Sequence, residues 1–431
     1  MPFRRRDLFA SAALPLLASD GFDFDTPYNR IGTDSTKWDA QIRRYGKNSI
    51  IAGMGISDTD FRTAPVITAA LQKRLQHENW GYLTIPDSFR QAILDWNQRR
   101  YGITIPPDRL LLANGVHSSI ISALRAFSPA GSKVLLLTPT YDGFFGDIAA
   151  ANCLPEQVPL KQANGRYLLD LEALDRHISH DTHSLILCNP NNPTGNAWSH
   201  DELTAVGELC TRRRVVLLID EIHCDLVNKG SQYTPFSRLH NREIVNNSVI
   251  FKSASKSFNL SALKCSWIYS ENPSYIQRIA ATGHSSDINT LGVVAAHAAL
   301  TQGEPWLNQL IAYIDGNHDF TASFIQKQIP LLSYSKPQAT YLAWVDVSRL
   351  LEKIGAQAQA DQANLARPNA AKPITAEIIL QDWLVQHAKV QLNAGTNYGR
   401  AGAGRMRMNL GASRQTLHLA LSSIAAALQK I

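Results

Sequence analysis

The sequence predicts an α/β fold, with a large domain built on a mostly parallel sheet flanked by helices and a smaller α+β domain. From about residue 64 to 325, short apolar runs rich in β-branched residues alternate with amphipathic segments. Apolar runs of this length are typical of strands buried on both faces, and their alternation with helices requires parallel strands joined by helical crossovers. A different pattern, with strands of alternating polarity, begins near residue 330.

Composition supports a globular protein of this size. The chain has 431 residues, of which 45% are hydrophobic and 18% are charged, enough for one large and one smaller domain. No apolar run approaches the roughly 18 residues of a membrane-spanning helix, so we expect no membrane span. The net charge is +6. Because the basic residues are scattered, apart from 4–6 and 212–214, this charge favours a generally basic surface over nucleic-acid binding.

The cysteines predict neither a disulfide framework nor a metal site. None of the five is spaced as CxxC, and most have apolar neighbours. Buried free thiols are the expected state. The five are Cys153, Cys188, Cys210, Cys224 and Cys265.

Residues 1–20 have the layout of an export leader. Arg5 and Arg6 precede Asp7-Leu8-Phe9, and a short Ala-rich apolar stretch follows at 10–18. This core resembles a twin-arginine signal, which exports folded proteins and would place the protein in the periplasm. Pro15 interrupts the apolar stretch, and no small-x-small cleavage site follows. The alternative is a basic tail on a cytoplasmic protein.

Five strands and one helix of the large domain can be placed from the sequence. Ser199 and Glu202 form a capping box that predicts a helix running to about Arg213. The expected buried strands are residues 134–138, 184–188, 215–219, 249–251 and 265–269.

Polar residues follow three of these strands directly. Asn189, Asp220 and Lys256 each lie just past a strand, and ligands of such sheets bind at the carboxyl ends of the strands. A buried lysine near other positive charge has a neutral amine, which can form an imine with an aldehyde. Asp220 offers a carboxylate that can pair with a pyridinium nitrogen, and Asn192 follows a neighbouring strand. Together with Lys256 these residues predict a pyridoxal phosphate site.

We divide the chain into a leader (1–20), an N-terminal segment of the small domain (21–63), the large cofactor-binding domain (64–325) and the small C-terminal domain (326–431). Within the last, residues 340–346 and 405–410 are expected strands. Residues 355–372 are rich in Ala, Gln and Asn and lack an apolar stripe, so we expect an exposed insertion there.

Several motifs in order resemble one family. The chain resembles fold-type I pyridoxal phosphate enzymes of the class I/II aminotransferase superfamily, and within it the MalY/PatB-type cystathionine β-lyases. The resemblance covers about residues 22–430. It rests on residues 22–25, 30–39, 58–61, 220–223, 253–260, 340–344 and 407–409.

The resemblance implies roles for the residues around the cofactor ring. Lys256 would hold the cofactor and then move protons at the substrate α-carbon. Asp220 would keep the pyridine nitrogen protonated, and Asn192 would donate a hydrogen bond to the phenolic oxygen. His223 aligns near the same oxygen, although a neutral histidine that only fills the wall is an equal alternative. Tyr141 matches the aromatic residue that stacks on the ring.

The phosphate needs amides and cations. Gly115 precedes a predicted helix, and amides at a helix N-terminus bind anions. The expected phosphate contacts are Gly115, Val116, His117, Ser253, Ser255 and Lys264.

The resemblance also implies substrate contacts. Arg407 matches the arginine that binds the α-carboxylate through a bidentate pair, with Arg405 as the near competitor. Tyr82 matches a tyrosine that reaches the neighbouring subunit's site, which implies an obligate homodimer with shared sites and a catalytic role for Tyr82. The chain departs from the family at Gly55, where relatives carry a bulky tryptophan. We expect this glycine to open the substrate entrance to leaving groups larger than homocysteine.

Three functions remain open at this point. A C–S β-lyase would cleave cystathionine or bulkier S-substituted cysteines to a thiol, pyruvate and ammonia. An aminotransferase would share the steps through α-proton abstraction and would need a keto acid partner. A binding or regulatory protein could keep the cofactor as a structural element, although intact Lys256, Asp220 and Arg407 argue against this.

Overall fold

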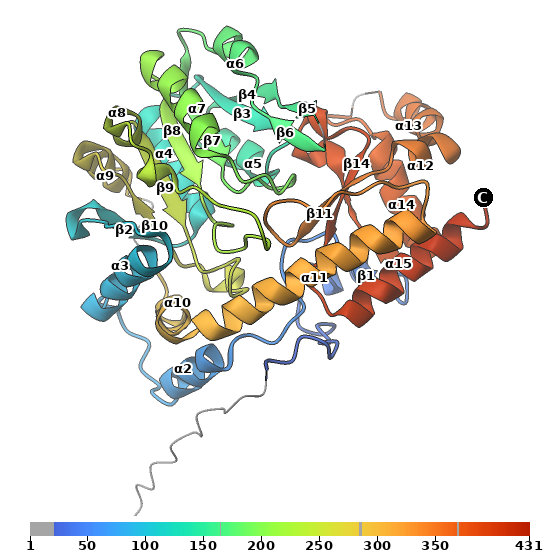
Figure 1. The fold of residues 1–431 in the computed structure, drawn as a ribbon, viewed down its shortest axis with the longest axis horizontal. Coiled ribbons are helices and arrows are strands. Elements are labelled where there is room, and N and C mark those ends of the chain that lie inside the picture. The colour runs from blue at the N-terminus through green and yellow to red at the C-terminus, as the bar shows by residue number, and fades with distance from the viewer. Residues whose placement is uncertain (1–20, 164, 284–286, 369) are drawn as a thin grey trace, which may run out of the picture.

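A computed structural model describes residues 21–163, 165–283, 287–368 and 370–431. The expected leader lies outside the described residues. The chain forms a large α/β part and a smaller part, and the long helix α11 (Glu304–Gln328) runs along both (Figure 1). None of the helices in the described ranges combines the length and the apolar character that crossing a membrane requires.

The large part is built on a seven-stranded sheet in the order β2-β10-β9-β8-β7-β3-β4. The five strands from β9 to β4 are parallel, as predicted. The strands are β2 (Leu110–Ala113), β3 (Lys133–Thr138), β4 (Leu154–Pro159), β7 (Thr182–Cys188), β8 (Val216–Asp220), β9 (Ser248–Lys252) and β10 (Ser266–Tyr269).

Strand β10 departs from the prediction of a parallel strand. It pairs antiparallel with both β9 and β2. Between β9 and β10 the chain forms only the short 3₁₀ helix η3 (Ser261–Leu263), with no crossover helix. Because a parallel neighbour needs a long crossover, the chain turns back and runs antiparallel.

Both faces of this sheet are buried, which explains the continuous apolar runs of its strands. On β3, Leu135 and Leu137 belong to one apolar core, whereas Val134 and Leu136 belong to another. The second core includes residues of α4, α5 and α9, which cover that face. The helices of the large part, besides α11, are α2 (Pro65–Leu75), α3 (Asp87–Tyr101), α4 (Val116–Phe127), α5 (Gly143–Ala150), α6 (Leu171–His177), α7 (His200–Arg212), α8 (Arg242–Asn246), α9 (Pro273–Ala280) and α10 (Thr290–Gln302).

Helix α7 begins at the predicted capping box. The Ser199 hydroxyl accepts from the Glu202 amide at 3.2 Å, and the Glu202 carboxylate accepts from the Ser199 amide at 2.9 Å. The two bonds satisfy amides that the helix itself leaves unpaired. The helix ends at Arg212, one residue before the predicted end.

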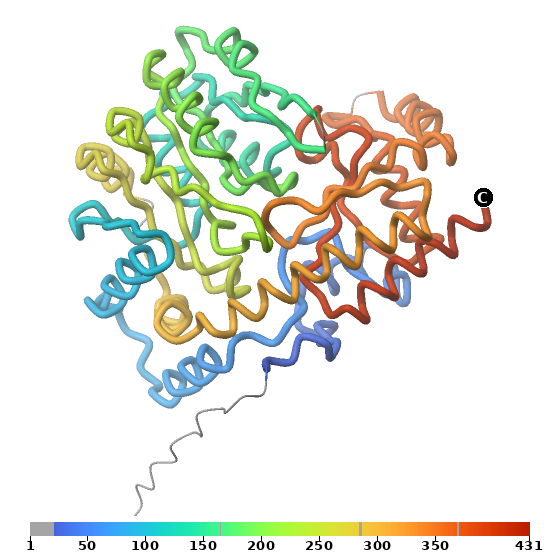
Figure 2. The backbone as a smooth tube through the Cα atoms, in the orientation of Figure 1, coloured from blue at the N-terminus to red at the C-terminus, as the bar shows by residue number. Residues whose placement is uncertain are grey.

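The smaller part joins the two ends of the described chain. Strand β1 (Ala52–Gly53) pairs with β12 (Val390–Gln391), so the N-terminal segment lies beside the C-terminal part (Figure 2). Ala52 and Met54 share an apolar core with residues of the C-terminal helices. The other elements are α1 (Asp39–Tyr45), β11 (Leu342–Asp346), α12 (Ser348–Lys353), α13 (Ala356–Leu365), α14 (Ala376–Ala388), β13 (Asn393–Ala394), β14 (Arg405–Asn409) and α15 (Arg414–Leu428).

Strand β11 is shorter and more buried than the predicted strand at 340–346. It begins at Leu342, because Thr340 has a φ of 75°, outside the β region. Four of its five residues are buried. Its partner β14 is antiparallel, as the prediction of a partly antiparallel subdomain requires.

The expected exposed insertion at 355–372 is in fact partly packed. Residues 356–365 form α13, in which Ala356 and Ala360 are fully buried. These residues lie one turn apart on one face of the helix, and α13 packs against α14. An interface of alanines gives no stripe of large apolar residues, so the pattern was not visible in the sequence.

The remaining short elements are the hairpin β5 (Lys161–Ala163) and β6 (Arg166–Leu168), and the 3₁₀ helices η1 (Pro107–Arg109), η2 (Phe236–Arg238), η4 (Gly395–Tyr398) and η5 (Arg400–Gly402). All five cysteines, which lie within the described residues, are buried and unpaired, as expected.

Candidate active site

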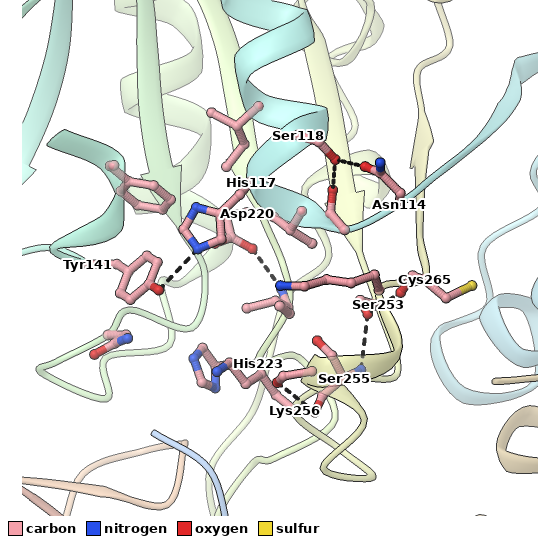
Figure 3. Close-up of a pocket in the computed structure, with 18 of the residues that line it drawn as sticks. Asn114, His117, Ser118, Tyr141, Asp220, His223, Ser253, Ser255, Lys256 and Cys265 are labelled. Carbon is pink, nitrogen blue, oxygen red and sulfur yellow. Dashed lines mark hydrogen bonds between the residues drawn. The ribbon is translucent and has the colours of Figure 1, made fainter. Parts of the chain in front are cut away.

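A cavity of about 580 Å³ opens beyond the carboxyl ends of β7, β8 and β9 (Figure 3). Every residue that the sequence assigned to the cofactor lines it. These are Gly115, Val116, His117, Tyr141, Asn192, Asp220, His223, Ser253, Ser255, Lys256 and Lys264. The arrangement follows from the sheet, because its parallel strands all end at this edge.

Lys256 lies in the turn that follows β9. Burial, followed by the charge of Arg407, lowers the pKa of its amine to about 8. The Nζ atom donates to the Ser57 carbonyl at 2.9 Å. A lysine with this pKa is partly neutral near physiological pH, as a nucleophilic amine must be.

Asp220 ends β8 and is 3% exposed. Burial raises the pKa of its carboxyl to about 7, and the amide of Ile222 opposes this by donating to Oδ1 at 3.0 Å. The charges of His117 and Lys256 lower this pKa, but neither residue forms an ion pair with Asp220 among the described residues. A buried carboxylate of this kind is stabilised by a cationic ligand.

The N-terminus of α4 offers amides to an anion. Gly115 precedes the helix with a φ of 130°, and only the Lys264 side chain would meet a Cβ there, at 3.9 Å. A ligand can therefore approach the backbone closely. The Gly115 amide already donates to Ser266 at 3.1 Å, so the amides of Val116 and His117 are the ones left for a ligand.

The two serines near Lys256 differ. The Ser253 hydroxyl donates to the Cys265 carbonyl at 2.6 Å and accepts from the Ser255 amide at 3.0 Å. Ser253 thus stabilises the turn, and its capacity to bind a ligand is largely used. The side chain of Ser255 lines the cavity together with Lys264.

Arg407 lies beside the cavity on β14 and is 3% exposed. Its Nη1 donates to Asn192 Oδ1 at 3.1 Å and its Nη2 to the Gly55 carbonyl at 2.6 Å, while the buried Nε has no partner among the residues that the structure describes. An unpaired buried donor on a guanidinium is costly unless an anion binds there. Arg405, the competitor, is neutralised by Asp346 at 3.1 Å.

Gly55 does not open the cavity as expected. A Cβ built on it would lie 2.3 Å from the Gln391 side chain, and Gln391 is itself buried. The Gln391 amide therefore fills the space next to the glycine. Gly55 also has no positive φ, so no tight turn requires a glycine here. Its contribution to the site is its carbonyl, which accepts from Arg407.

Tyr82 is not brought to the site in the single chain. Its relative exposure is 109%, and it lies in the segment between α2 and α3. Trp80 in the same segment is also exposed.

The pKa values of the two cavity histidines are shifted in opposite directions. His223 is 1% exposed, and burial, followed by Lys256, keeps its pKa well below the usual range, so its imidazole is neutral. Figure 3 shows His117 Nε2 facing the Tyr141 hydroxyl, which lies 3.1 Å away. The Nδ1 atom of His117 lies 2.9 Å from the Asp147 carboxylate. Asp147 raises the pKa of this imidazole.

Among the residues that sequence reasoning missed are Ser57 and Asp147, which contact Lys256 and His117. Ser57 supplies the carbonyl that Lys256 donates to, and a main-chain contact of this kind leaves no mark in the sequence. Asp147 was detectable, because on α5 it lies on the same face as the buried Phe144 and next to the buried Ile148. A charged residue on a buried helical face indicates a specific partner.

Comparison with known proteins places this geometry in context. The profile of the family described as aminotransferase class I and II matches residues 49–424. Cystathionine beta-lyase PatB of Bacillus subtilis (strain 168) is 34% identical over 94% of this chain and 100% of its own length. Protein MalY of Escherichia coli (strain K12) is 31% identical over 95% of this chain and 100% of its own length. The crystal structure of a PLP-bound putative aminotransferase from Clostridium difficile 630 superposes with a TM-score of 0.84 at 30% identity, covering 95% of this chain and all of that one.

Proposed function

The chain belongs to the aminotransferase class I and II family, and within this family we propose that it is a pyridoxal-phosphate-dependent C–S β-lyase. Its substrates would be cystathionine or other S-substituted L-cysteines, and its products a thiol, pyruvate and ammonia. The observation that carries the lyase assignment is the end-to-end match to a relative named cystathionine beta-lyase.

The residues of the cavity fit the cofactor. Asp220 is a buried carboxylate with no ion-pair partner among the described residues, and the protonated ring nitrogen would provide one. The free amides at the start of α4 and the Lys264 amine suit the phosphate. Asn192 lies at the cavity wall, where its side chain can contact the ring oxygen. When bound, pyridoxal phosphate supplies an aldehyde for amines and a ring that withdraws electrons from the α-carbon.

The chain's own groups divide the chemistry. Lys256 has an amine poised to lose its proton, so it can bind the aldehyde and later take the substrate's α-proton. Asp220 would keep a proton on the ring nitrogen when the cofactor is bound. Arg407 binds the substrate carboxylate with its unpaired Nε and with Nη2, which must first release the Gly55 carbonyl.

The aminotransferase remains the second candidate. The solved structure from Clostridium difficile is described as a putative aminotransferase, and a transferase would use the same lysine, aspartate and arginine. The two reactions differ after α-proton removal, because only the lyase expels the group on the β-carbon.

The test is to give the purified holoenzyme cystathionine and bulkier S-substituted cysteines. Pyruvate and free thiol are measured in one reaction, and amino transfer to an added 2-keto acid in another. The lyase proposal expects thiol and pyruvate in equal amounts without a keto acid. Transfer that depends on the keto acid, with no thiol release, would support the aminotransferase.

Assembly as a homodimer with shared sites is also part of this proposal. The exposed aromatic side chains of Trp80 and Tyr82, two residues apart in one segment, support it, because neighbouring exposed apolar groups favour a protein partner. Mixing an inactive Lys256→Ala chain with an inactive Tyr82→Ala chain would restore activity if each site needs residues of both subunits. Failure to restore activity in a mixture that forms heterodimers would refute shared sites.

We further propose that residues 1–20 are an export leader of the twin-arginine type, with Arg5-Arg6 at its core supporting this. A reporter fused to these residues should leave the cytoplasm. Changing both arginines to lysine should retain it. A reporter that stays in the cytoplasm with the native leader would refute export.

A further inference from the structure

The side chains of one cluster beside the cavity take no part in the proton transfers described above. His117 lies between Asp147 and Tyr141, with Nδ1 2.9 Å from both carboxylate oxygens and Nε2 3.1 Å from the phenolic hydroxyl (Figure 3 shows the second contact). The three residues come from three segments, namely α4, α5 and the turn before α5. Asp147 is 4% exposed, whereas the His117 side chain is 51% exposed and lines the cavity.

This geometry fixes the orientation of the imidazole. The buried carboxylate accepts the Nδ1 hydrogen, so Nε2 always faces the Tyr141 hydroxyl. When His117 is neutral, Nε2 accepts the phenolic hydrogen. When His117 is protonated, Nε2 donates to the phenolic oxygen, and the phenolic hydrogen is free to donate into the cavity. The protonation state of His117 therefore decides where Tyr141 donates.

The charges that face the cluster favour the protonated imidazole. A hydrogen bond and the charge of Asp147 raise the pKa of His117, and Asp220 adds to this, whereas burial and Lys256 oppose it. Burial, followed by the charge of Asp142, raises the pKa of Tyr141 above its usual range. The Tyr141 hydroxyl therefore gives up its proton only when a neighbouring group supplies another proton to the phenolic oxygen.

We propose that His117, held by Asp147, supplies a proton through the Tyr141 hydroxyl to the sulfur that leaves the substrate. This inference rests on the proposed lyase function. The C–S bond breaks with its electron pair on sulfur, and sulfur takes the phenolic proton of Tyr141. The phenolic oxygen then takes the Nε2 proton of His117, and the neutral imidazole regains a proton from solvent, which its exposed edge allows. Because His117 and Asp147 act through Tyr141, they are positioning residues.

The leaving group provides the sharpest test. Holoenzyme is given two S-substituted cysteines of similar size, one that releases a basic alkanethiolate and one that releases a weakly basic nitroarenethiolate. Only the basic thiolate needs a proton as the bond breaks. We expect His117→Gln to lower kcat for the alkyl substrate by about 10²-fold or more and for the nitroaryl substrate by much less. Equal losses on both substrates would overturn the proposal.

Two further variants separate the relay from a packing effect. Asp147→Asn should show the same dependence on the leaving group as His117→Gln. The double variant His117→Gln with Tyr141→Phe should lose no more than Tyr141→Phe alone, because the two residues act in one path. Additive losses in the double variant would overturn the proposal. His200→Gln is the matched control, since His200 also lies beside a carboxylate, Asp201 at 3.5 Å, but is not among the residues that line the cavity.

A readout without turnover completes the test. Proton NMR of histidine-labelled protein, with His117→Gln to assign the resonance, should give His117 a pKa above that of an ordinary imidazole, and Asp147→Asn should lower it. An unchanged pKa in Asp147→Asn would overturn the role of the aspartate. Wild-type enzyme could release no thiol from either substrate while Asp147→Asn still lowers the pKa of His117. That combination would refute the proposed lyase function and would leave the contact between His117 and Asp147 confirmed.

Discussion

The Nη2 atom of Arg407 donates to the Gly55 carbonyl at 2.6 Å, so the main chain occupies the position at which we propose that the substrate carboxylate binds. Nη1 donates to Asn192, and the guanidinium carbon lies 4.8 Å from the centre of the Tyr398 ring. These two contacts fix the orientation of the guanidinium plane. The guanidinium is thus oriented before substrate binds, and only the contact with Gly55 has to be exchanged. A pre-oriented arginine loses little side-chain entropy on binding a carboxylate.

Arg407→Ala should therefore raise KM for amino acid substrates by about 10- to 150-fold, the value of hydrogen bonds to a charged group. Arg405→Ala is the matched control, because Arg405 lies on the same strand and is paired with Asp346. It should change KM much less. Steady-state kinetics with one S-substituted cysteine measures both. The opposite ranking would transfer carboxylate binding to Arg405.

Gly55→Trp should destabilise the protein more than it narrows the substrate range, because the indole would collide with the buried Gln391 side chain. Overpacking of this kind costs about 1–3 kcal/mol or more. Melting curves should show a lower Tm for Gly55→Trp and a partial recovery in Gly55→Trp with Gln391→Ala. An unchanged Tm, with loss of bulky substrates alone, would restore Gly55 to the substrate entrance.

Asp220 should make the stability of the cofactor-free protein fall as the pH rises from about 4 to about 7. The carboxyl pKa is about 7 in the folded state and 3.8 in the unfolded state, so between these values the folded protein holds a proton that the unfolded chain has lost. This proton stabilises the folded state at low pH, and the stabilisation decreases as the pH rises toward 7. Asp220→Asn should remove this part of the pH dependence. Denaturant unfolding at several pH values measures it, and an identical profile in both proteins would contradict the raised pKa.

Asp220→Ala should also lower turnover by far more than it weakens cofactor binding. Without the carboxylate the ring nitrogen loses its proton, and a neutral ring withdraws electrons poorly. Turnover and the cofactor dissociation constant are measured on the same preparation. Near wild-type turnover would mean that another group holds the nitrogen's proton.

The sequence predicted the sheet and the cavity well, because both follow from local pattern. Apolar runs marked the strands, and Asn189, Asp220 and Lys256 marked their carboxyl ends. What it could not predict depends on contacts between distant segments. Gln391 fills the space beside Gly55 from across the β1–β12 pair, and the direction of β10 depends on the connection that precedes it. The packing of α13 rests on alanines, which give too weak an apolar signal.

The central claim is that Lys256 in this cavity carries a C–S β-elimination. The most direct measurement compares wild-type holoenzyme with Lys256→Ala on one S-alkyl cysteine, following thiol and pyruvate together with no keto acid added. Wild type should release the two in equal amounts, and Lys256→Ala should lose about 10²–10⁴-fold or more in rate while keeping its melting temperature. Equal rates in the two proteins, or amino transfer without thiol release in wild type, would contradict the account.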